Sequence, residues 1–481
     1  MSTTTSPEVN RRWLGLAVIA AAQFMVIMDT SIIGVALPRM QAALGFTQEN
    51  LSWVFNAYVV ALGGLLLLGG KLSDVLGARR VFSAGWLVLL AGSLVAGLAG
   101  NVETELVGRS VQGAGSALIA PSALTLLFML FGSNPKELPK ALALYGAAAP
   151  AGGTAGVFLG GLITEYLSWP WVFYLNIPIA LVILALVPRV MPAGGAGSGR
   201  RVDILGAVTV TAGLAAVVYA VVRTPEVGWN SGQTWWVLAI GAVLITAFVA
   251  LQAKGRAPLV RLGIFRASNL AAANLAQLLL GAAWIPMWFF LNLYLQQVLG
   301  FTAFPSGAAL LPMTLLIMLG MIALAPRVLA AIGPKAATVT GMTLLAVGMS
   351  WLALIDQDGS YAVDVLPASL LAALGMSLAF IPTLGTALSS ARPEEGGLAS
   401  GIVNTSYQIG SALGLAVMTA IAAANGADQL GDKAALTEGF SAAFIGAAIV
   451  AGAGALTTLA FFRRPTGAGS EAESAPEQIV V

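Results

Sequence analysis

The first apolar run of the chain reads WLGLAVIAAAQFMVIMDTSIIGVAL, residues 13–37, and a single charged residue, Asp29, interrupts it. An α-helix needs roughly 20 apolar residues to cross the hydrocarbon core of a bilayer, so this run predicts a transmembrane helix. Arg11 and Arg12 directly precede the run and are interpreted as its cytoplasmic anchor. A cleaved twin-arginine export signal is disfavoured, because the run exceeds a signal h-region and further spans follow at once.

Similar runs, bounded by charged residues, Pro or Gly, follow along the whole chain. We expect fourteen transmembrane helices, at residues 13–37, 51–70, 80–100, 105–131, 140–163, 169–188, 203–222, 234–253, 268–295, 306–329, 335–355, 363–388, 398–424 and 440–462. An even number of helices places both termini on the same side of the membrane. The prediction is an all-α polytopic membrane protein with both termini in the cytoplasm.

The distribution of positive charge supports this count, because loops on the cytoplasmic side of a membrane protein are enriched in Lys and Arg. With fourteen helices, 19 of the 23 Lys and Arg residues fall on the side of the N-terminus. Arg39, Arg223 and Lys433 fall on the other side, and Arg109 falls inside a span. One helix more or fewer would invert every later loop and remove this bias.

Composition excludes several classes of function. The chain is 58% hydrophobic and 9% charged, whereas soluble proteins carry roughly 25% charged residues. Cys and His are absent, which removes disulfides, the usual metal ligands and the commonest general base, so no metal or cofactor is expected and proton chemistry must use carboxylates. The net charge of +2 does not favour nucleic-acid binding, and no nucleotide-binding P-loop motif occurs.

The spans and loops divide the chain into units. The division is 1–12 as a cytoplasmic segment, 13–189 as a six-helix bundle, 190–202 as a linker, 203–254 as two inserted helices, 255–267 as a cytoplasmic loop, 268–462 as a second six-helix bundle and 463–481 as a disordered tail. The sequence LGFT occurs after the first helix, from Leu44, and again after the ninth, from Leu299. Such repeats are typical of transporters whose central site opens alternately to each side.

Two ionisable residues stand out inside the expected spans, and charges at such depth mark functional sites by default. Asp29 and Arg109 lie roughly 12 Å and 9 Å below the outer surface at 1.5 Å per residue, so they can face each other. A carboxyl group removed from water binds protons more readily, so we expect Asp29 to couple transport to protons. A purely structural ion pair is the open alternative. Glu165, at the outer end of the fifth helix, is a secondary candidate.

The loop GKLSDVLGARR, residues 70–80, is a short turn with glycines at both ends and basic residues at the cytoplasmic surface. It resembles the signature between helices 2 and 3 of the major facilitator superfamily, with Val75 and Ala78 at two positions that are basic in that signature. The resemblance implies that Gly70, Asp74, Gly77 and Arg79 form a conformational latch between the bundles.

Further segments resemble the fourteen-helix drug/proton antiporter branch of that family, and together they cover nearly the whole chain. They are MDTSIIGVALP (28–38), LVGR with QGAG (106–115), WPWVFYLNIP (169–178), QQVLG (296–300) and GIVN (401–404). The resemblance implies two six-helix bundles with two inserted helices, and it implicates Arg109 in proton transfer.

The fifth expected helix carries Gly152, Gly156 and Gly160 at four-residue spacing, which allows another helix to approach closely. GVFLGG, ending at Gly161, resembles the antiporter signature of this helix, with Val157 in place of its proline. Aromatic side chains are candidates for a substrate cavity, although lipid-facing packing explains them equally well. They are Trp53, Tyr58, Trp284, Trp288 and Tyr407.

The favoured function is export of amphipathic, drug-like molecules from the cytoplasm across the plasma membrane in exchange for protons, by a monomer. The alternative is a metabolite exporter or facilitator on the same fold without strict antiport, which the valine at 157 leaves open. An intramembrane serine enzyme is disfavoured, because no histidine exists to activate Ser400. Acids are absent from the second-half spans, which favours neutral, weakly cationic or zwitterionic substrates.

Overall fold

The computed structural model describes residues 7–134, 136–192, 203–255, 258–260, 262–266, 269–390 and 396–462. Within these ranges the regular structure is entirely helical. Helices satisfy every backbone hydrogen bond within one segment, which is why apolar runs of this length adopt them in lipid. The segment 1–6, most of the expected linker and the expected tail lie outside the described residues.

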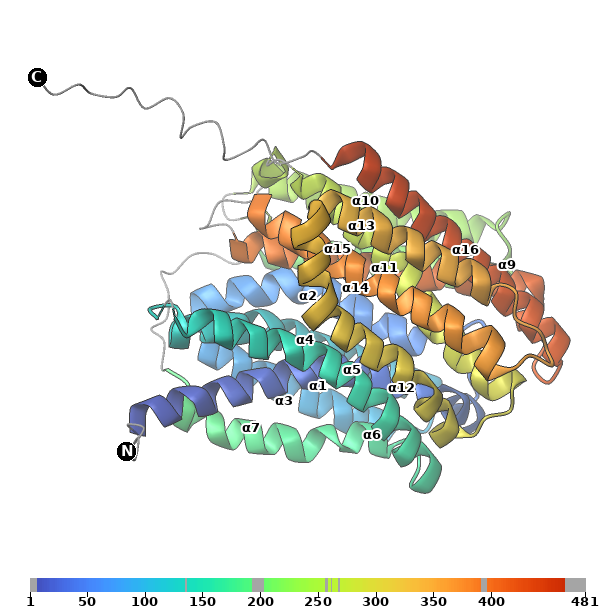
Figure 1. Ribbon diagram of the computed structural model, residues 1–481, viewed down its shortest axis with the longest axis horizontal. Coiled ribbons are helices and arrows are strands. Elements are labelled where there is room, and N and C mark those ends of the chain that lie inside the picture. Colours follow the sequence, from blue (N-terminus) through green and yellow to red (C-terminus); the bar gives the residue numbers. More distant parts are fainter. Residues whose placement is uncertain are drawn as a thin grey trace, which may run out of the picture.

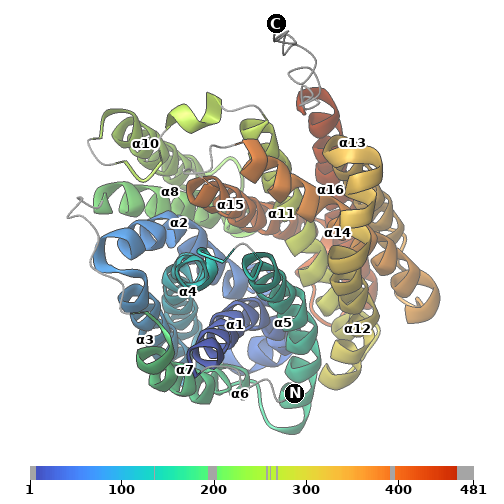
Figure 2. The ribbon, with the colours of Figure 1, turned by 60° about the vertical axis from the view of Figure 1, so that its left-hand side comes forward.

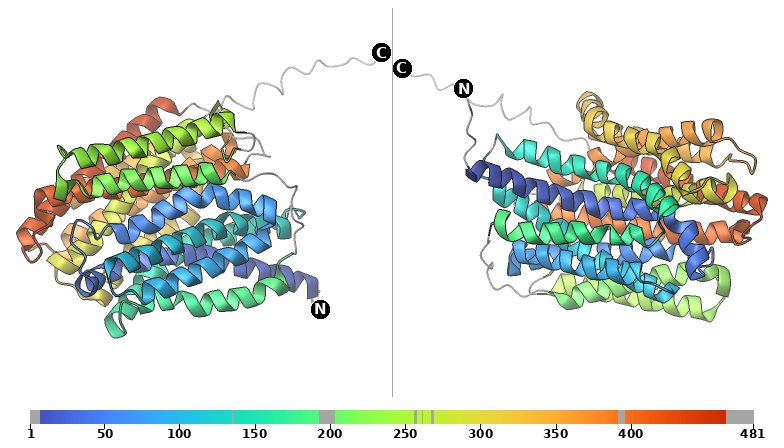
Figure 3. Two further views of the ribbon diagram at one scale, coloured as in Figure 1. Left: turned by 180° about the vertical axis from the view of Figure 1, so that it is seen from behind. Right: turned by 90° about the horizontal axis from the view of Figure 1, so that it is seen from below.

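The N-terminal half, residues 7–190, contains seven helices. They are α1 (Pro7–Leu44), α2 (Trp53–Leu76), α3 (Ala78–Gly97), α4 (Val102–Phe131), α5 (Leu138–Tyr166), the short α6 (Trp171–Tyr174) and α7 (Asn176–Val190). The inserted pair consists of α8 (Ile204–Val222) and α10 (Gly232–Lys254), joined through α9 (Thr224–Val227). The pair packs beside α2 and α15 at one side of the bundle (Figures 2 and 3).

The C-terminal half, residues 269–462, follows a short 3₁₀ turn, η1 (Leu262–Arg266). It comprises α11 (Leu270–Leu293), α12 (Ala303–Leu319), α13 (Ala325–Leu352), α14 (Leu366–Ser390), α15 (Gly396–Ala422) and α16 (Lys433–Phe461). Four π-helical turns interrupt or extend these helices: η2 (Tyr294–Val298), η3 (Gly320–Leu324), η4 (Tyr361–Val365) and η6 (Ala423–Ala427).

Among the described residues, 13 helices are long and apolar enough to cross a membrane. One of them, Ala303–Leu352, has 50 residues and is broken at Gly333, whose φ of 77° and ψ of 168° are not helical. A straight helix of that length would measure roughly 75 Å, more than twice the hydrocarbon thickness of roughly 30 Å. The break divides it into two segments that can each cross, so the expected count of fourteen is compatible with the structure.

The two halves pack their helices in matching pairs. In the N-terminal half α1 packs on α5 and α3 on α4, while in the C-terminal half α11 packs on α15 and α13 on α14. Across the boundary α5 packs on α12, and α15 packs on α2. This reciprocal pattern favours the duplication that the repeated LGFT predicts. In Figure 1, α1 begins and α16 ends toward the same side of the bundle. We call that side the near end and the opposite side the far end.

Several expected helix ends were wrong. α1 begins at Pro7 and continues through Pro38 to Leu44, so the helix is longer at both ends than the expected span 13–37. The guanidinium of Arg12 pairs with Glu137 at 3.0 Å and lies over the ring of Phe131, which keeps this charged residue within the packed helix. α16 begins earlier than expected, because Asp432 accepts hydrogen bonds from the backbone N–H groups of its first turn.

Candidate functional site

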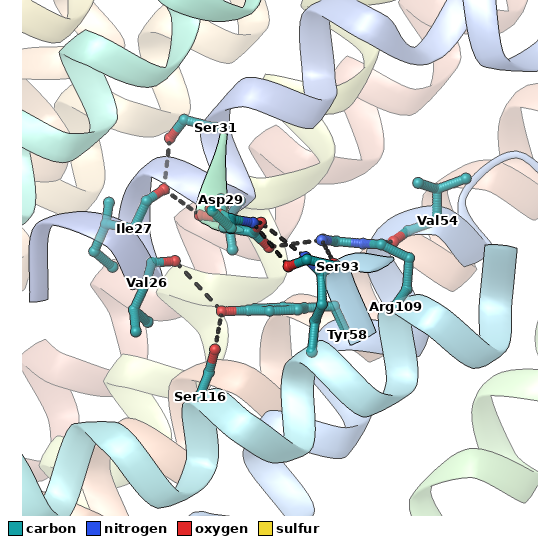
Figure 4. A network of polar contacts seen from close by, with 12 residues as sticks. Val26, Ile27, Asp29, Ser31, Val54, Tyr58, Ser93, Arg109 and Ser116 are labelled. Carbon is teal, nitrogen blue, oxygen red and sulfur yellow. Dashed lines mark hydrogen bonds and ion pairs between the residues drawn. The ribbon is translucent and has the colours of Figure 1, made fainter. Parts of the chain in front are cut away.

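A buried ion pair lies in the core of the N-terminal half (Figure 4). Nη1 of Arg109, on α4, donates to Oδ2 of Asp29, on α1, at 2.6 Å. The two residues are 0% and 1% exposed. The structure therefore brings together the two ionisable residues that the sequence placed at similar depths.

Neutral polar groups complete the coordination of the Asp29 carboxylate. Nδ2 of Asn176, the first residue of α7, donates to Oδ1 at 2.8 Å, and Nε2 of Gln112 donates to the same oxygen at 3.2 Å. Both amides also donate to the hydroxyl of Ser93 on α3. Both Asp29 oxygens thus accept hydrogen bonds, from α4 and α7. Gln112 and Asn176 fall within motifs quoted above, but the sequence alone did not mark them as site residues.

Arg109 has partners of its own besides Asp29. Its Nε donates to the backbone oxygen of Val54 at 3.0 Å, and Nη1 also donates to Oε1 of Gln112 at 2.7 Å. Its guanidinium lies 4.5 Å from the ring centroid of Tyr58, a cation–π arrangement. The Tyr58 hydroxyl donates to Ser116 at 2.8 Å. Tyr58 therefore belongs to this charged network.

The glycine face of α5 holds the Asp29 segment in place from the opposite side. A Cβ at Gly156 would lie 2.8 Å from Cβ of Ser31 and 2.9 Å from the backbone oxygen of Met28. Gly152 and Gly160 likewise touch the backbone of α1. Side chains at these positions would push α1 away, so the glycines set how closely Asp29 approaches α4. Gly161 instead faces α12, next to Ala303 and Phe304.

The structure adds a third buried ionisable residue, which corrects the expectation of a single buried acid. Glu105 lies on α4 one helical turn before Arg109 and is 0% exposed. The burial of Glu105 was hard to predict, because Glu105 and Glu103 both lie in the first turn of a helix, where acids are common at the surface. Its burial depends on neighbouring helices, which a local pattern does not reveal.

Side-chain hydrogen bonds join the two halves at the far end. Gln41, Gln48 and Gln297 form a closed ring, which we call the glutamine ring: Gln41 donates to Gln48 at 3.0 Å, Gln48 to Gln297 at 3.2 Å, and Gln297 to Gln41 at 3.0 Å. Nearby, Oε2 of Glu165 accepts the backbone N–H of Ala303 at 3.0 Å. Glu165 thus ties α5 to the start of α12, a structural contact that needs no proton transfer.

The remaining candidates lie apart from the ion pair. Gly77 has a φ of 91° and forms the turn between α2 and α3, while Asp74 and Arg79 form no ion pair with any described residue. Trp53 packs against Tyr219 of α8, with ring centroids 6.3 Å apart, and so faces the inserted pair. Trp284 and Trp288 are buried in α11, and Tyr407 packs edge-on against Phe380.

A bundle of long apolar helices in two matched halves, with a buried ion pair in one of them, defines a polytopic membrane transporter. The chain belongs to the Major Facilitator Superfamily, whose family model matches residues 19–415. It is therefore a transporter of small molecules rather than an enzyme, and a multi-pass protein of the inner (plasma) membrane.

Several relatives carry names that refer to antibiotics. The chain is 37% identical to the cephamycin export protein CmcT of Amycolatopsis lactamdurans, over 90% of this chain and 89% of the relative. It is 36% identical to the puromycin resistance protein pur8 of Streptomyces alboniger, over 88% and 84%. It is 32% identical to the lincomycin resistance protein of Streptomyces lincolnensis, over 85% and 84%.

Solved structures share the fold. The nucleoside transporter NupG superposes with a TM-score of 0.65 at 12% identity, covering 94% of this chain and 100% of the other. The peptide transporter POT gives 0.67 at 14% identity, covering 93% and 94%. At such identities the likeness concerns the fold alone.

Proposed function

We propose that this transporter exports amphipathic antibiotic-like molecules from the cytoplasm in exchange for protons, and that Asp29 carries the coupling proton. The observation that carries the proposal is the Asp29–Arg109 pair, held away from water at 2.6 Å by amides from two helices. Leaving one buried charge without its partner costs about 3–5 kcal/mol. Protonation of Asp29 would release Arg109 and so favour a rearrangement of the helices that hold it.

The class of substrate follows from the relatives and from the C-terminal half. Relatives at 32–37% identity are named for cephamycin, puromycin and lincomycin, which points to bulky polyfunctional molecules. The ion pairs whose two partners are both described lie in the N-terminal half. The described part of the C-terminal half contains no ion pair of its own. It therefore suits neutral, weakly cationic or zwitterionic molecules, which its aromatic side chains can contact.

Placing the near end in the cytoplasm, as the positive-inside rule favours, puts the glutamine ring on the outer side. Hydrogen bonds from α1 and the loop after it to η2 then close the outer side in this conformation. Export by alternating access requires this closure to open after substrate enters from the cytoplasm.

The test uses everted membrane vesicles with tritiated puromycin as the probe. Vesicles with the wild-type protein should accumulate puromycin when a pH gradient is imposed, and Asp29→Asn should reduce accumulation to the level of vesicles without the transporter. Asp358→Asn, at an exposed acid of the C-terminal half, serves as the control and should behave as wild type. Accumulation that survives Asp29→Asn would contradict Asp29 as the proton carrier.

The same vesicles test the alternative of a facilitator or a metabolite exporter without antiport. Val157 stands where the related antiporter signature has proline, and its backbone oxygen touches Gly307 of α12. A facilitator would equilibrate puromycin across the membrane without responding to the pH gradient. A metabolite exporter would leave puromycin outside the vesicles under every condition.

A further inference from the structure

Glu105 is a buried acid to which the ion-pair network gives no partner. It is 0% exposed, and neither Oε1 nor Oε2 has a hydrogen-bond partner in the described structure. The Asp29 carboxylate, by contrast, accepts hydrogen bonds on both oxygens. A carboxylate without water or a partner is strongly disfavoured relative to a neutral carboxylic acid. The stable form of Glu105 in this conformation therefore carries a proton.

Arg109 offers the complementary unused group. Its Nη2 is buried and has no acceptor, although Nε and Nη1 are both engaged. Glu105 and Arg109 lie four residues apart on one helix, so their side chains share a face of α4. Two acids and one guanidinium in a dry core are neutral overall only when the two acids hold one proton between them.

We propose that Glu105 is a second proton carrier, which exchanges one proton with Asp29 while Arg109 changes partner. In the conformation described, Glu105 is a carboxylic acid and Asp29 is a carboxylate paired with Arg109. The transfer moves the proton from the Glu105 carboxyl to the Asp29 carboxylate, and Arg109 turns its guanidinium to the Glu105 carboxylate that remains. The core keeps its net charge, so neither state leaves an unpaired buried ion.

The position of Glu105 along α4 sets the direction of the proton transfer. α4 begins at Val102, after an exposed turn at the far end, so Glu105 lies between that surface and the Asp29–Arg109 pair. Water at the far end can reload Glu105 when the far end opens, and Asp29 then delivers the proton toward the near end. This inference rests on the proposed antiport, and it identifies Glu105 as the residue at which protons enter from the far end.

Few other titratable groups face Glu105. Asp29 of α1 and Arg109 of α4 are close enough to act on it electrostatically. Tyr58 of α2 lies against Arg109 and donates its hydroxyl to Ser116. α3 carries its charged residues, Arg79 and Arg80, at the opposite end of the bundle.

The test compares Glu105→Gln with Glu103→Gln in proteoliposomes, using puromycin as the probe. Glu103 is exposed and two residues away on the same helix, so it is a matched control. Glu105→Gln should reduce puromycin transport driven by a pH gradient by roughly a hundredfold, the scale on which a positioned proton carrier acts. It should retain exchange of labelled for unlabelled puromycin, which moves no net proton. Glu103→Gln should match wild type in both assays.

The outcomes separate this inference from the proposed function. Gradient-driven transport that is lost in Asp29→Asn but intact in Glu105→Gln would overturn the role of Glu105 alone. Wild-type protein that exchanges puromycin but ignores the gradient would overturn the antiport and the proton-carrier role together.

Infrared spectroscopy of the purified wild-type protein gives a second measurement, which does not depend on how a variant folds. The spectrum at neutral pH should show the carbonyl stretch of a protonated carboxylic acid. Glu105→Asp, which keeps a titratable group, should retain such a band if Glu105→Gln fails to fold. Absence of the band in the wild-type protein would overturn the proposal.

Discussion

Asp29 in α1 and Trp284 in α11 occupy matching places in the two halves, 255 residues apart, which is also the distance from Leu44 to Leu299 in the repeated LGFT. Both are buried, at 1% and 7% exposure. Around Asp29 the core holds an arginine and amides, whereas α11 continues into a cluster of edge-on rings formed by Phe289, Phe290 and Phe444. The two halves thus pack their helices in matching pairs, while the buried charged side chains among the described residues lie in the N-terminal half.

That difference separates two tasks. In the proposed mechanism the N-terminal half changes its charge state, because Asp29 and Glu105 bind and release protons. The C-terminal half presents apolar and neutral polar surface, which suits contact with organic molecules. Four predictions test this division, in order of decreasing expected effect.

Arg109→Met should have the largest effect on stability, because it leaves the Asp29 carboxylate buried without its cation. The expected loss is about 3–5 kcal/mol, measured as a lower midpoint of thermal unfolding in detergent. Adding Asp29→Asn to this variant should restore part of the loss. Gln277→Leu, at a buried C-terminal amide without partners, should be neutral or stabilising. Equal losses of stability in Arg109→Met and Gln277→Leu would contradict the proposed difference between the two halves.

Gly156→Val and Gly414→Val probe the packing that the halves share. Gly156 of α5 faces the backbone of α1, and Gly414 of α15 faces the backbone of α11 at Ala282. Each added side chain should cost about 1–3 kcal/mol of stability by overpacking. Thermal unfolding should report similar losses, while the pH-gradient response at saturating puromycin should fall more for Gly156→Val. If the pH-gradient response fell more in Gly414→Val than in Gly156→Val, the packing of α5 would not determine the position of Asp29.

Gln48→Leu should weaken closure at the far end. The chain has no cysteine, so Val298→Cys, at a buried residue beside Gln297, can report opening without other thiols. Gln48 takes part in two bonds of the ring, each worth about 0.5–1.5 kcal/mol, so maleimide labelling should accelerate roughly five- to 150-fold relative to Val298→Cys alone. An unchanged labelling rate would mean that the glutamine ring does not hold the far end closed.

Trp53→Leu should have the smallest effect, because Trp53 packs on Tyr219 of the inserted pair and not on the charged core. Loss of this ring contact should cost about 0.5–1.5 kcal/mol. The ratio of gradient-driven transport to exchange should stay at the wild-type value. A change in that ratio would extend the coupling machinery to α8.

The sequence predicted the helical class and the central pair well, because a charge inside an apolar run is conspicuous. Asp29 and Arg109 were both visible in this way. Glu105 was not, because the amphipathic start of a helix hides whether its acids face solvent or protein. The glutamine ring was equally hidden, since neutral amides from residues 41 and 297 meet only through the tertiary fold. The Gly333 break falls between the expected spans 306–329 and 335–355.

In the glutamine ring each amide donates to the next, and Gln297 also donates to Gln48 at 3.4 Å. Such cycles are cooperative, so removal of one bond weakens the others and the ring opens as a unit. Amide side chains carry no net charge and no proton that titrates near neutrality, so neither membrane voltage nor acidity acts on this closure directly. In the proposed mechanism its opening is therefore driven mechanically, and α1 can transmit the movement because it bears Gln41 near one end and Asp29 near its middle.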